Sequence, residues 1–347
     1  MTRDMIRVLI ADDSELMRKV LRDLLTRDAG IDVVAEAGDG RQALAEVLRV
    51  RPDLVIMDIL MPVMDGLTAV SEIMACRPTP ILVLSANLNP EENRHAFQAI
   101  NRGALDVMEK PSGLGSVSFE EFAAKLIAEV KFLARIRVVH HFRRSSIVPS
   151  ALLASPQLDQ SVREILAIGA STGGPRAVRQ LMTTLDPANG ARVLIVQHIA
   201  GGFAGDFASW LDRESRFSVR LVRDGDRLEP GVALVAPEGL HLTLLDDRVV
   251  LTDAPPVHSC RPSVDVLFHS LAGSAAGRTV AVLLTGMGQD GAEGMLALRR
   301  QGGYTIAQDE ASSAIFGMPK AAIDLGGAQQ VLSLEAMPAV LARLLKR

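Results

Sequence analysis

The chain has 347 residues, a formal net charge of −4, 48% hydrophobic residues and 22% charged residues. This length exceeds one ordinary core and suggests two domains, and the composition is that of a folded soluble protein rather than a disordered one. Neither residues 1–135 nor residues 161–347 carry an excess of Lys and Arg. That balance argues against a nucleic-acid binder, which would neutralise phosphates with basic side chains.

The cysteines and the N-terminal segment indicate in which cellular compartment the protein acts. The two cysteines, Cys76 and Cys260, lie far apart without metal-ligand spacing, which rules out a zinc site based on cysteines and fits a reducing compartment. The N-terminus lacks an apolar segment followed by a cleavage site. The longest apolar runs are shorter than the roughly 20 residues of a membrane helix. We therefore expect a cytoplasmic protein without membrane insertion.

Short apolar runs alternate with amphipathic helical patterns from the start of the chain. Five such units predict a flavodoxin-like (βα)5 domain, a doubly wound α/β fold, because parallel strands need crossover helices on both faces of their sheet. The expected strands are Ile6–Ala11, Val33–Glu36, Leu54–Met57, Ile81–Leu84 and Asp106–Met108, and the expected helices are Ser14–Leu25, Gly40–Val50, Asp65–Ala75, Glu91–Asn101 and Phe119–Ile136.

A segment between the two halves breaks this alternation. It contains a basic stretch, HHFRRSS, and then Pro and Ser residues without a period, which indicates a linker. The alternation then resumes, and we expect strands at Ile165–Gly169, Val193–Val196 and Val280–Thr285, with Val232–Ala236 and Leu240–Leu251 as strands or a hairpin around Pro237–Gly239. We predict a first domain at 1–136, a linker at 137–160, and a second doubly wound, mostly parallel α/β domain with a β-hairpin at 161–347.

Acidic residues end the strands of the first domain. Asp12 and Asp13 follow the first strand, Asp58 follows the third, and Ser85 and Lys110 follow the fourth and fifth. Ligands bind at the carboxyl ends of parallel strands, and converging carboxylates suit Mg²⁺. A carboxylate can accept a phosphoryl group when a metal and a lysine neutralise the incoming oxygens. Strand-end acids also serve as helix N-caps, and this is the alternative interpretation.

The first domain resembles the receiver domains of bacterial two-component response regulators. That resemblance implies that Asp58 is phosphorylated, that Asp12 and Asp13 hold Mg²⁺ with it, and that Ser85 and Lys110 sense the phosphoryl group. One position departs from the pattern, because receivers often carry an aromatic residue three before the lysine and this chain has valine there (Val107). The resemblance rests on the segments VLIADDSELMR, VIMDILMPVMDG, LVLSA and DVMEKP.

A serine follows the first strand of the second domain. Ser171 lies in the sequence GASTG, which fits the G-x-S-x-G turn that exposes a nucleophile, although a helix N-cap explains it equally well. A serine nucleophile needs a base and an orienting acid. His198 and Asp290 are the candidates, because each follows another predicted strand. The chain order Ser-His-Asp differs from the Ser-Asp-His order of α/β-hydrolases.

The sequence around Asp290 permits a second interpretation. Gly286 to Gly291 spells G-x-G-x-x-G between a strand and a helix, and Asp309 follows near the spacing of a ribose-binding acid. This pattern would indicate a dinucleotide fold, although the fingerprint normally opens the first unit of its domain. A receiver joined to a non-catalytic adaptor is a further alternative.

The second domain resembles the catalytic domain of the bacterial chemotaxis protein-glutamate methylesterase. The resemblance implies that Ser171 is the nucleophile, His198 the general base and Asp290 its orienting acid, with backbone N–H groups around Met287 binding the oxyanion. It covers residues 162–345 through the segments IGASTGGP, IVQHI, CRPSVDVLFHSLA, LLTGMGQDGAEGM and TIAQDEASSAIFGMPKAAI.

The two resemblances together imply a phosphorylation-activated serine hydrolase of chemotaxis. It would demethylate glutamate methyl esters on methyl-accepting chemoreceptors, release methanol, deamidate receptor glutamines, and so provide adaptation. The expected phosphodonor is a chemotaxis histidine kinase. Mg²⁺ would serve receiver phosphorylation, and the esterase would need no cofactor. We expect the first domain to restrict access to the second until Asp58 is phosphorylated.

Overall fold

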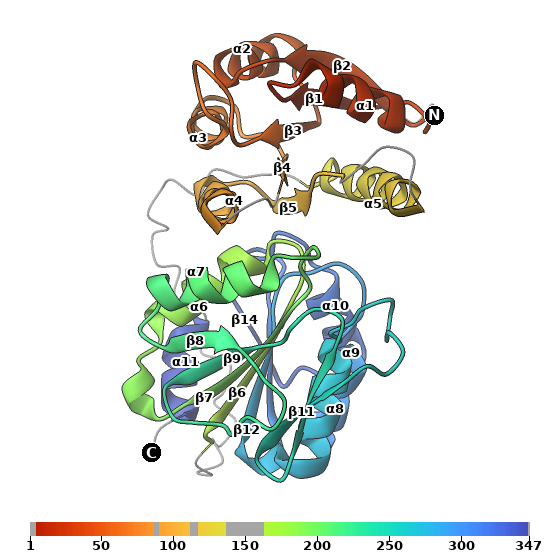
Figure 1. The fold of residues 1–347 in the computed structure, drawn as a ribbon. Helices are drawn as coiled ribbons and strands as arrows, with labels where there is room; N and C mark the ends of the chain where they lie inside the picture. Colours follow the sequence, from red (N-terminus) through yellow and green to blue (C-terminus); the bar gives the residue numbers. More distant parts are fainter. Residues whose placement is uncertain (1–4, 87–89, 112–116, 137–162, 346–347) are drawn as a thin grey trace.

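The computed structural model describes residues 5–86, 90–111, 117–136 and 163–345. Figure 1 shows two layered α/β units stacked on one another, the first ending with α5 and the second beginning with β6. The predicted linker at 137–160 lies outside the described residues. The domain boundaries therefore stay a prediction, whereas the predicted fold class of both domains is confirmed.

The first unit has a five-stranded parallel sheet in the order β2-β1-β3-β4-β5. Its elements are β1 (Ile6–Ala11), α1 (Glu15–Leu25), β2 (Ile31–Ala37), α2 (Gly40–Val50), β3 (Leu54–Asp58), α3 (Gly66–Cys76), β4 (Ile81–Ser85), α4 (Pro90–Arg102), β5 (Asp106–Glu109) and α5 (Val117–Leu133). Helices α1 and α5 pack on one face through Leu21 and Leu126. Helices α2, α3 and α4 cover the other face through Val47, Ile73 and Phe97.

The second unit has a seven-stranded parallel sheet in the order β14-β13-β12-β6-β7-β9-β8. Its strands are β6 (Ile165–Ala170), β7 (Arg192–Gln197), β8 (Ser218–Leu221), β9 (Val232–Val235), β12 (Thr279–Leu283), β13 (Tyr304–Gln308) and β14 (Gln330–Leu332). Its helices are α6 (Gly174–Thr184), α7 (Ala204–Glu214), α8 (Val264–Ser274), α9 (Ala292–Arg300), α10 (Met318–Asp324) and α11 (Met337–Leu344), with short 3-10 turns at Pro187–Asn189 and Ala276–Arg278. Strand β6 is fully buried along its length, as its apolar sequence predicts.

A separate hairpin lies against α8. Its strands are β10 (His241–Leu245) and β11 (Arg248–Thr252), which pair antiparallel. The hairpin turns at Asp246 and Asp247, both with positive φ (48° and 59°), as two-residue hairpin turns require. The predicted strands on either side of Pro237–Gly239 are present, but the alternative of a hairpin around this segment is wrong, because β9 joins the main sheet between β7 and β8 instead.

Three strands of the second sheet were not predicted. Two of them, β8 and β14, are edge strands whose partly exposed side chains give no continuous apolar run. The third, β13, is fully buried, but Thr305 and Gln308 interrupt its apolar pattern.

The two units meet through an apolar contact between α4 and α7 (Figure 1). Phe97 of α4 stacks on Trp210 of α7, with ring centroids 5.3 Å apart and an interplanar angle of 21°. The rings of Phe203 and Phe207 surround Phe97 at centroid distances of 6.3 and 5.9 Å. All four rings are almost completely buried, so the contact is a small core shared by the two units.

Candidate active site

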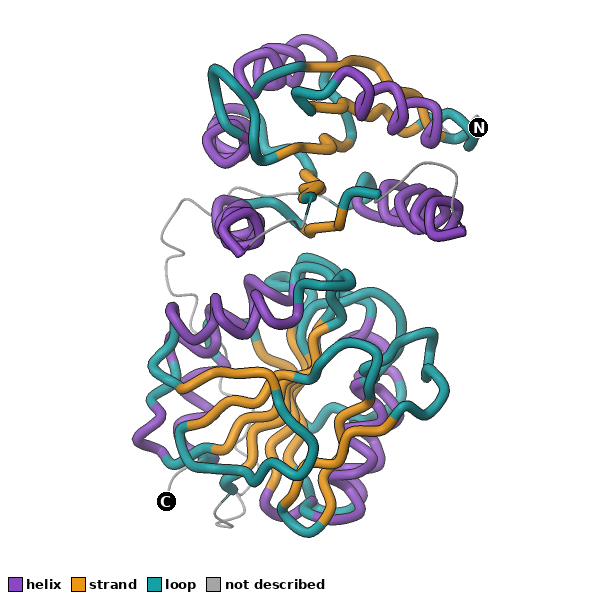
Figure 2. Tube along the Cα trace, viewed as in Figure 1, coloured by secondary structure: helices purple, strands orange, loops and turns teal. Residues whose placement is uncertain are grey.

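The strands of the second sheet run side by side through the middle of the second unit (Figure 2), and three predicted residues follow its central strands. Strand β6 lies between β7 and β12. The strands that follow β6 in the chain are first added to the sheet on the β7 side and later on the β12 side. Ligand sites of open parallel sheets lie beyond the strand ends at such a switch point. Ser171 directly follows β6, His198 directly follows β7, and Asp290 lies in the loop after β12.

Close backbone packing positions Ser171 in a tight turn. Its N–H donates to the Thr285 carbonyl (3.0 Å), and its own carbonyl accepts from the N–H of Gly174, where α6 begins (2.7 Å). Gly286 lies so near that a Cβ there would be 2.7 Å from Ser171 Cβ. The N-cap of α6 is Gly173, with φ +74° and no side-chain capping bond. The Ser171 hydroxyl therefore does not cap the helix, unlike the alternative interpretation of the sequence.

His198 and Asp290 form a hydrogen-bonded pair. Nε2 of His198 lies 2.8 Å from Oδ2 of Asp290, and the opposite ring nitrogen, Nδ1, lies 3.7 Å from Sγ of Cys260. Burial lowers the pKa of His198, but the hydrogen bonds to Asp290 and Cys260 outweigh it and raise the pKa to about 9. Because a carboxylate only accepts hydrogen bonds, Nε2 carries a proton and Nδ1 is the nitrogen that can act as a base.

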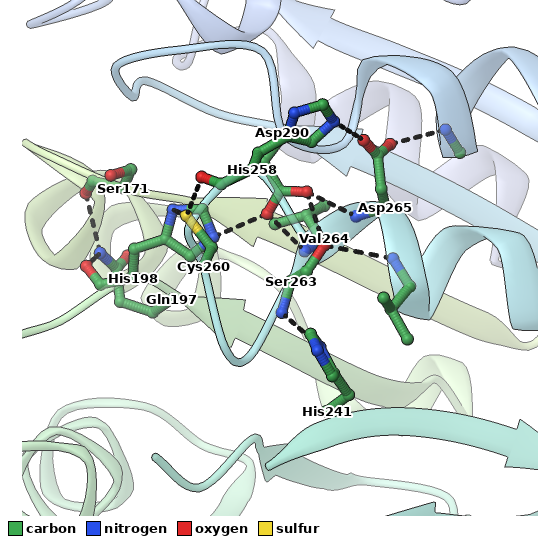
Figure 3. A network of polar contacts seen from close by, with 12 residues as sticks. Ser171, Gln197, His198, His241, His258, Cys260, Ser263, Val264, Asp265 and Asp290 are labelled. Carbon is green, nitrogen blue, oxygen red and sulfur yellow. Dashed lines mark hydrogen bonds and ion pairs between the residues drawn. The ribbon is translucent and has the colours of Figure 1, made fainter. Parts of the chain in front are cut away.

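The Asp290 carboxylate is held at the N-terminus of α8 (Figure 3). It accepts from the hydroxyl of Ser263 (2.7 Å) and from the N–H groups of Val264 (2.7 Å) and Asp265 (3.0 Å). Burial raises the pKa of Asp290, but the bonds to His198, Ser263 and Asp265 outweigh burial and leave its pKa below the usual value. Asp290 therefore remains a charged, fixed partner for His198.

A glutamine joins the turns that carry the serine and the histidine. The side-chain amide of Gln197 donates to the carbonyls of Ser171 and His198, each at 2.8 Å. Within the described residues, the Ser171 hydroxyl makes no hydrogen bond to His198, whose Nδ1 faces Cys260 instead. Catalytic hydrogen bonds often form only once substrate is bound, so this arrangement is compatible with a resting state.

Sequence reasoning missed several members of this network. Gln197 directly follows a predicted strand but belongs to no recognisable motif. Ser263 is recognisable as a helix N-cap because it precedes an apolar helical run. Cys260 precedes that helix in a loop without a periodic pattern, so nothing in the sequence connects it to His198.

The other candidate histidines of this domain lie elsewhere. His241 is fully buried, accepts the Ser263 N–H at Nδ1 and contacts the Pro255 carbonyl with Nε2. His258 is an exposed residue that pairs with Asp265 at 3.1 Å, and His269 is exposed on α8. The histidine that the structure pairs with Asp290 is therefore His198, the candidate chosen from strand ends.

The glycine-rich loop after β12 packs against the serine. Gly286 contacts Ser171, and the Asp290 side chain points to the start of α8 rather than to a phosphate position. Asp309 caps the following turn by accepting from Ser312. Met287 is 55% exposed, and its N–H has no acceptor in the part of the chain that the structure describes. This geometry gives the dinucleotide interpretation no support and leaves a backbone donor beside the serine.

The acidic residues of the first unit meet at the C-terminal edge of its sheet. Carboxylate oxygens of Asp12, Asp13 and Asp58 all lie within 4.8 Å of one another, and the Lys110 ammonium pairs with Asp12 (2.7 Å) and Asp58 (2.9 Å). Ser85 is buried beside them at the end of β4. Burial raises the pKa of Asp58, although Lys110 opposes the shift. Sequence reasoning predicted all five residues.

The first unit lies over the edge of the second sheet that carries Ser171. A cavity of about 170 Å³ is lined by Asp106, Val107 and Glu129 of the first unit and by Ser171 and His198 of the second. Burial, followed by repulsion from Glu129, raises the pKa of Asp106. The atypical Val107 is thus buried and lines the same cavity as Ser171.

Comparison with known proteins identifies two families in the chain. The family "CheB methylesterase" matches residues 166–341, and the family "Response regulator receiver domain" matches residues 8–117. In the described part of the chain, no helix is both long and apolar enough to cross a membrane.

Similar proteins cover nearly the whole chain. The protein-glutamate methylesterase/protein-glutamine glutaminase 2 of Anaeromyxobacter dehalogenans is 45% identical over 98% of this chain and 97% of that protein. A protein of Geobacter metallireducens with the same name, number 4, is 41% identical over 94% of this chain and 95% of its own. The crystal structure of the Thermotoga maritima CheB methylesterase catalytic domain matches 52% of this chain and 98% of that chain, with a TM-score of 0.50 and 35% identity.

Proposed function

Because the chain belongs to the CheB methylesterase family and carries a receiver domain before its catalytic domain, we propose that it is a phosphorylation-regulated protein-glutamate methylesterase and protein-glutamine glutaminase. Its substrates are methylated glutamates and glutamines of chemoreceptors, and the ester reaction yields glutamate and methanol. A chemotaxis histidine kinase is the phosphodonor. The enzyme acts in the cytoplasm and provides adaptation in the signalling pathway.

The proposed catalytic residues are Ser171, His198 and Asp290. The observation that carries this assignment is the 2.8 Å pair of His198 and Asp290, set next to a serine in a tight turn at the switch point of the sheet. A nucleophile, a base and an acid that orients the base form the arrangement needed for acyl transfer. A non-catalytic adaptor would not need a charged aspartate buried against a histidine at this position.

The reaction follows from these positions. Ser171 Oγ attacks the ester carbonyl while Nδ1 of His198 takes the hydroxyl proton, and the same nitrogen returns that proton to the leaving methanol. Water then repeats the cycle on the acyl-enzyme. For glutamine, the leaving group is ammonia. Asp290 holds the imidazole in one orientation and stabilises its charged form.

The negative oxygen of the tetrahedral intermediate needs donors near Ser171. Gly286, which precedes the free N–H of Met287, packs against Ser171, and α6 begins at Gly174, shortly after the serine. A helix N-terminus favours negative charge. Losing one such donor costs about 3–4 kcal/mol of transition-state stabilisation in comparable sites.

The receiver controls the esterase by covering its active site. A glutamate side chain on a long receptor helix can reach Ser171 only if the cavity opens to a macromolecule. The buried ring cluster around Phe97 holds the domains together in the resting state, and Asp106 and Val107 line the cavity that also contains Ser171. Phosphorylation of Asp58, sensed by Ser85 and Lys110, shifts the equilibrium towards the undocked form.

The acidic pocket of the receiver fits Mg²⁺. Three carboxylates within 4.8 Å of one another are oxygen ligands suited to a hard divalent cation. Asp12, Asp13 and Asp58 would hold the ion, which when bound supplies positive charge that neutralises an incoming phosphoryl group. Lys110 already contacts two of these carboxylates and contributes a further positive charge.

Methanol release from methylated chemoreceptor, with and without a small-molecule phosphodonor, tests the proposal. We expect release that the phosphodonor stimulates and that Ser171→Ala abolishes. His269→Ala is a matched control, because His269 is exposed on α8 and is not among the residues that line the cavities beside His198. Methanol release that persists in Ser171→Ala would contradict the assignment.

A further inference from the structure

Cys260 contacts the catalytic base at its reactive nitrogen. Its Sγ lies 3.7 Å from Nδ1 of His198 and 3.4 Å from the carbonyl oxygen of His258. The proposed esterase reaction uses Nδ1 but assigns no role to the thiol. Chain spacing ruled out a site based on two cysteines, but it could not detect a histidine that folding brings beside one cysteine (Figure 3).

The separation of the two atoms is that of two ligands on one metal ion. Zinc binds thiolate sulfur at about 2.3 Å and imidazole nitrogen at about 2.0–2.1 Å, so a tetrahedral ion separates the two donors by roughly 3.5–3.6 Å. The observed 3.7 Å needs almost no rearrangement. Thiolate and imidazole together favour zinc over hard cations such as Mg²⁺.

The hydrogen-bonding environment of His198 also resembles that of a metal-binding histidine. Metal-bound histidines usually donate their second N–H to a carboxylate, which fixes the tautomer and strengthens the ligand. Asp290 does this for Nε2 at 2.8 Å, and it is itself fixed by Ser263 and Val264. Nδ1 therefore faces Cys260 before any ion arrives.

The pair is accessible while the two domains are docked. A cavity of about 180 Å³ lies on the Cys260 side of His198, and its lining residues all belong to the second domain. It includes Glu238 and Arg261 as well as the two donors. This space has room for the water molecules that would complete the coordination of an ion with two protein ligands.

We propose that Nδ1 of His198 and Sγ of Cys260 together bind a zinc ion that inhibits the esterase. The thiol proton and, below about pH 9, the Nδ1 proton of His198 are released to solvent, and the ion takes the place between the two atoms. Inhibition rests on the proposed function, because the ion occupies the lone pair that must accept the Ser171 proton. Metal binding itself does not depend on that function.

The test compares the full-length protein with two cysteine variants. Methanol release is measured over a series of zinc concentrations, each variant being normalised to its own zinc-free rate. We expect zinc to inhibit the wild type and Cys76→Ser at the same concentration, since Cys76 is exposed at the end of α3. Cys260→Ser should need at least about tenfold more zinc, the smallest loss typical of disturbed metal sites.

A spectroscopic measurement separates binding from catalysis. Cobalt(II) replaces zinc in such sites, and a bound thiolate gives it a charge-transfer band in the near ultraviolet. We expect that band in the wild type and in Cys76→Ser, and its loss in Cys260→Ser and in His198→Ala. The band needs no substrate, so it would persist even if the proposed esterase activity were wrong.

Two results would overturn the inference. One is equal zinc inhibition of Cys260→Ser and the wild type, which would place the inhibitory metal elsewhere. The other is a cobalt spectrum without a thiolate band, or with a band that depends on Cys76. Mg²⁺ at the same concentrations should neither inhibit through Cys260 nor compete with cobalt.

Discussion

Replacing Phe97 with alanine should activate the unphosphorylated enzyme. Phe97 belongs to the receiver, but its ring is fully buried against Phe203, Phe207 and Trp210 of the catalytic domain. It is the receiver's contribution to the shared ring cluster. Removing it destabilises the docked state more than the undocked state, because undocking exposes the part of the ring that faces the catalytic domain.

The size of the effect follows from burial. Truncating a buried phenylalanine costs about 3–5 kcal/mol when every contact is lost. Part of the Phe97 ring faces its own domain, where it belongs to the cluster on the α2–α4 face, so we assign about 2–3 kcal/mol to docking. Because each 1.4 kcal/mol changes an equilibrium constant tenfold, docking should weaken by about 30–150-fold. The gain in activity is limited by the rate of the free catalytic domain.

The assay is methanol release without a phosphodonor, measured for the wild type, Phe97→Ala and a fragment of residues 161–347. We expect Phe97→Ala to approach the rate of the fragment and to respond little to phosphorylation. Phe119→Ala is the control, because Phe119 is buried within the receiver against α1 and does not belong to the interface cluster. An unchanged rate in Phe97→Ala, or an equal increase in Phe119→Ala, would refute the reasoning.

Three further predictions concern the catalytic and phosphorylation sites. Ser171→Ala and His198→Ala should each reduce ester hydrolysis to near the uncatalysed rate, and the double variant should be little slower than either. Asp290→Ala should reduce the rate less, because Asp290 acts through the base. Additive losses in single-turnover kinetics would contradict the view that these residues act as a unit. Asp58→Asn should abolish Mg²⁺-dependent phosphorylation by a small-molecule phosphodonor, and undiminished labelling of that variant would identify another acceptor. The base must be neutral to accept a proton, and the pKa of His198 is raised to about 9, so kcat/KM should rise with pH up to about 9. Cys260→Ser removes one cause of the raised pKa and should move this rise to lower pH. Coincident pH profiles of the variant and the wild type would contradict this.

The sequence by itself determined the local elements and the strand-end residues. Alternating apolar runs and helical patterns predicted both parallel sheets, and the rule that ligands bind at strand ends selected Asp58, Lys110, Ser171 and His198. The structure places these residues at strand ends as predicted, because each position depends on a short segment. A buried strand of a parallel sheet is apolar along its whole length, and the residue that follows it must lie at the sheet edge.

Only the tertiary structure decided which distant residues meet. Placing Asp290 against His198 requires β12 to pair beside β6 across more than a hundred residues, and no local pattern encodes that choice. Cys260 reaches His198 from a loop without periodicity, and Phe97 looks like an ordinary core residue of α4 until α7 is packed on it. The hairpin turn failed for the same reason. Local turn chemistry favoured Pro237–Gly239, but β9 gains more by pairing with β7 and β8, because sheet pairing and burial outweigh the preference of a single turn.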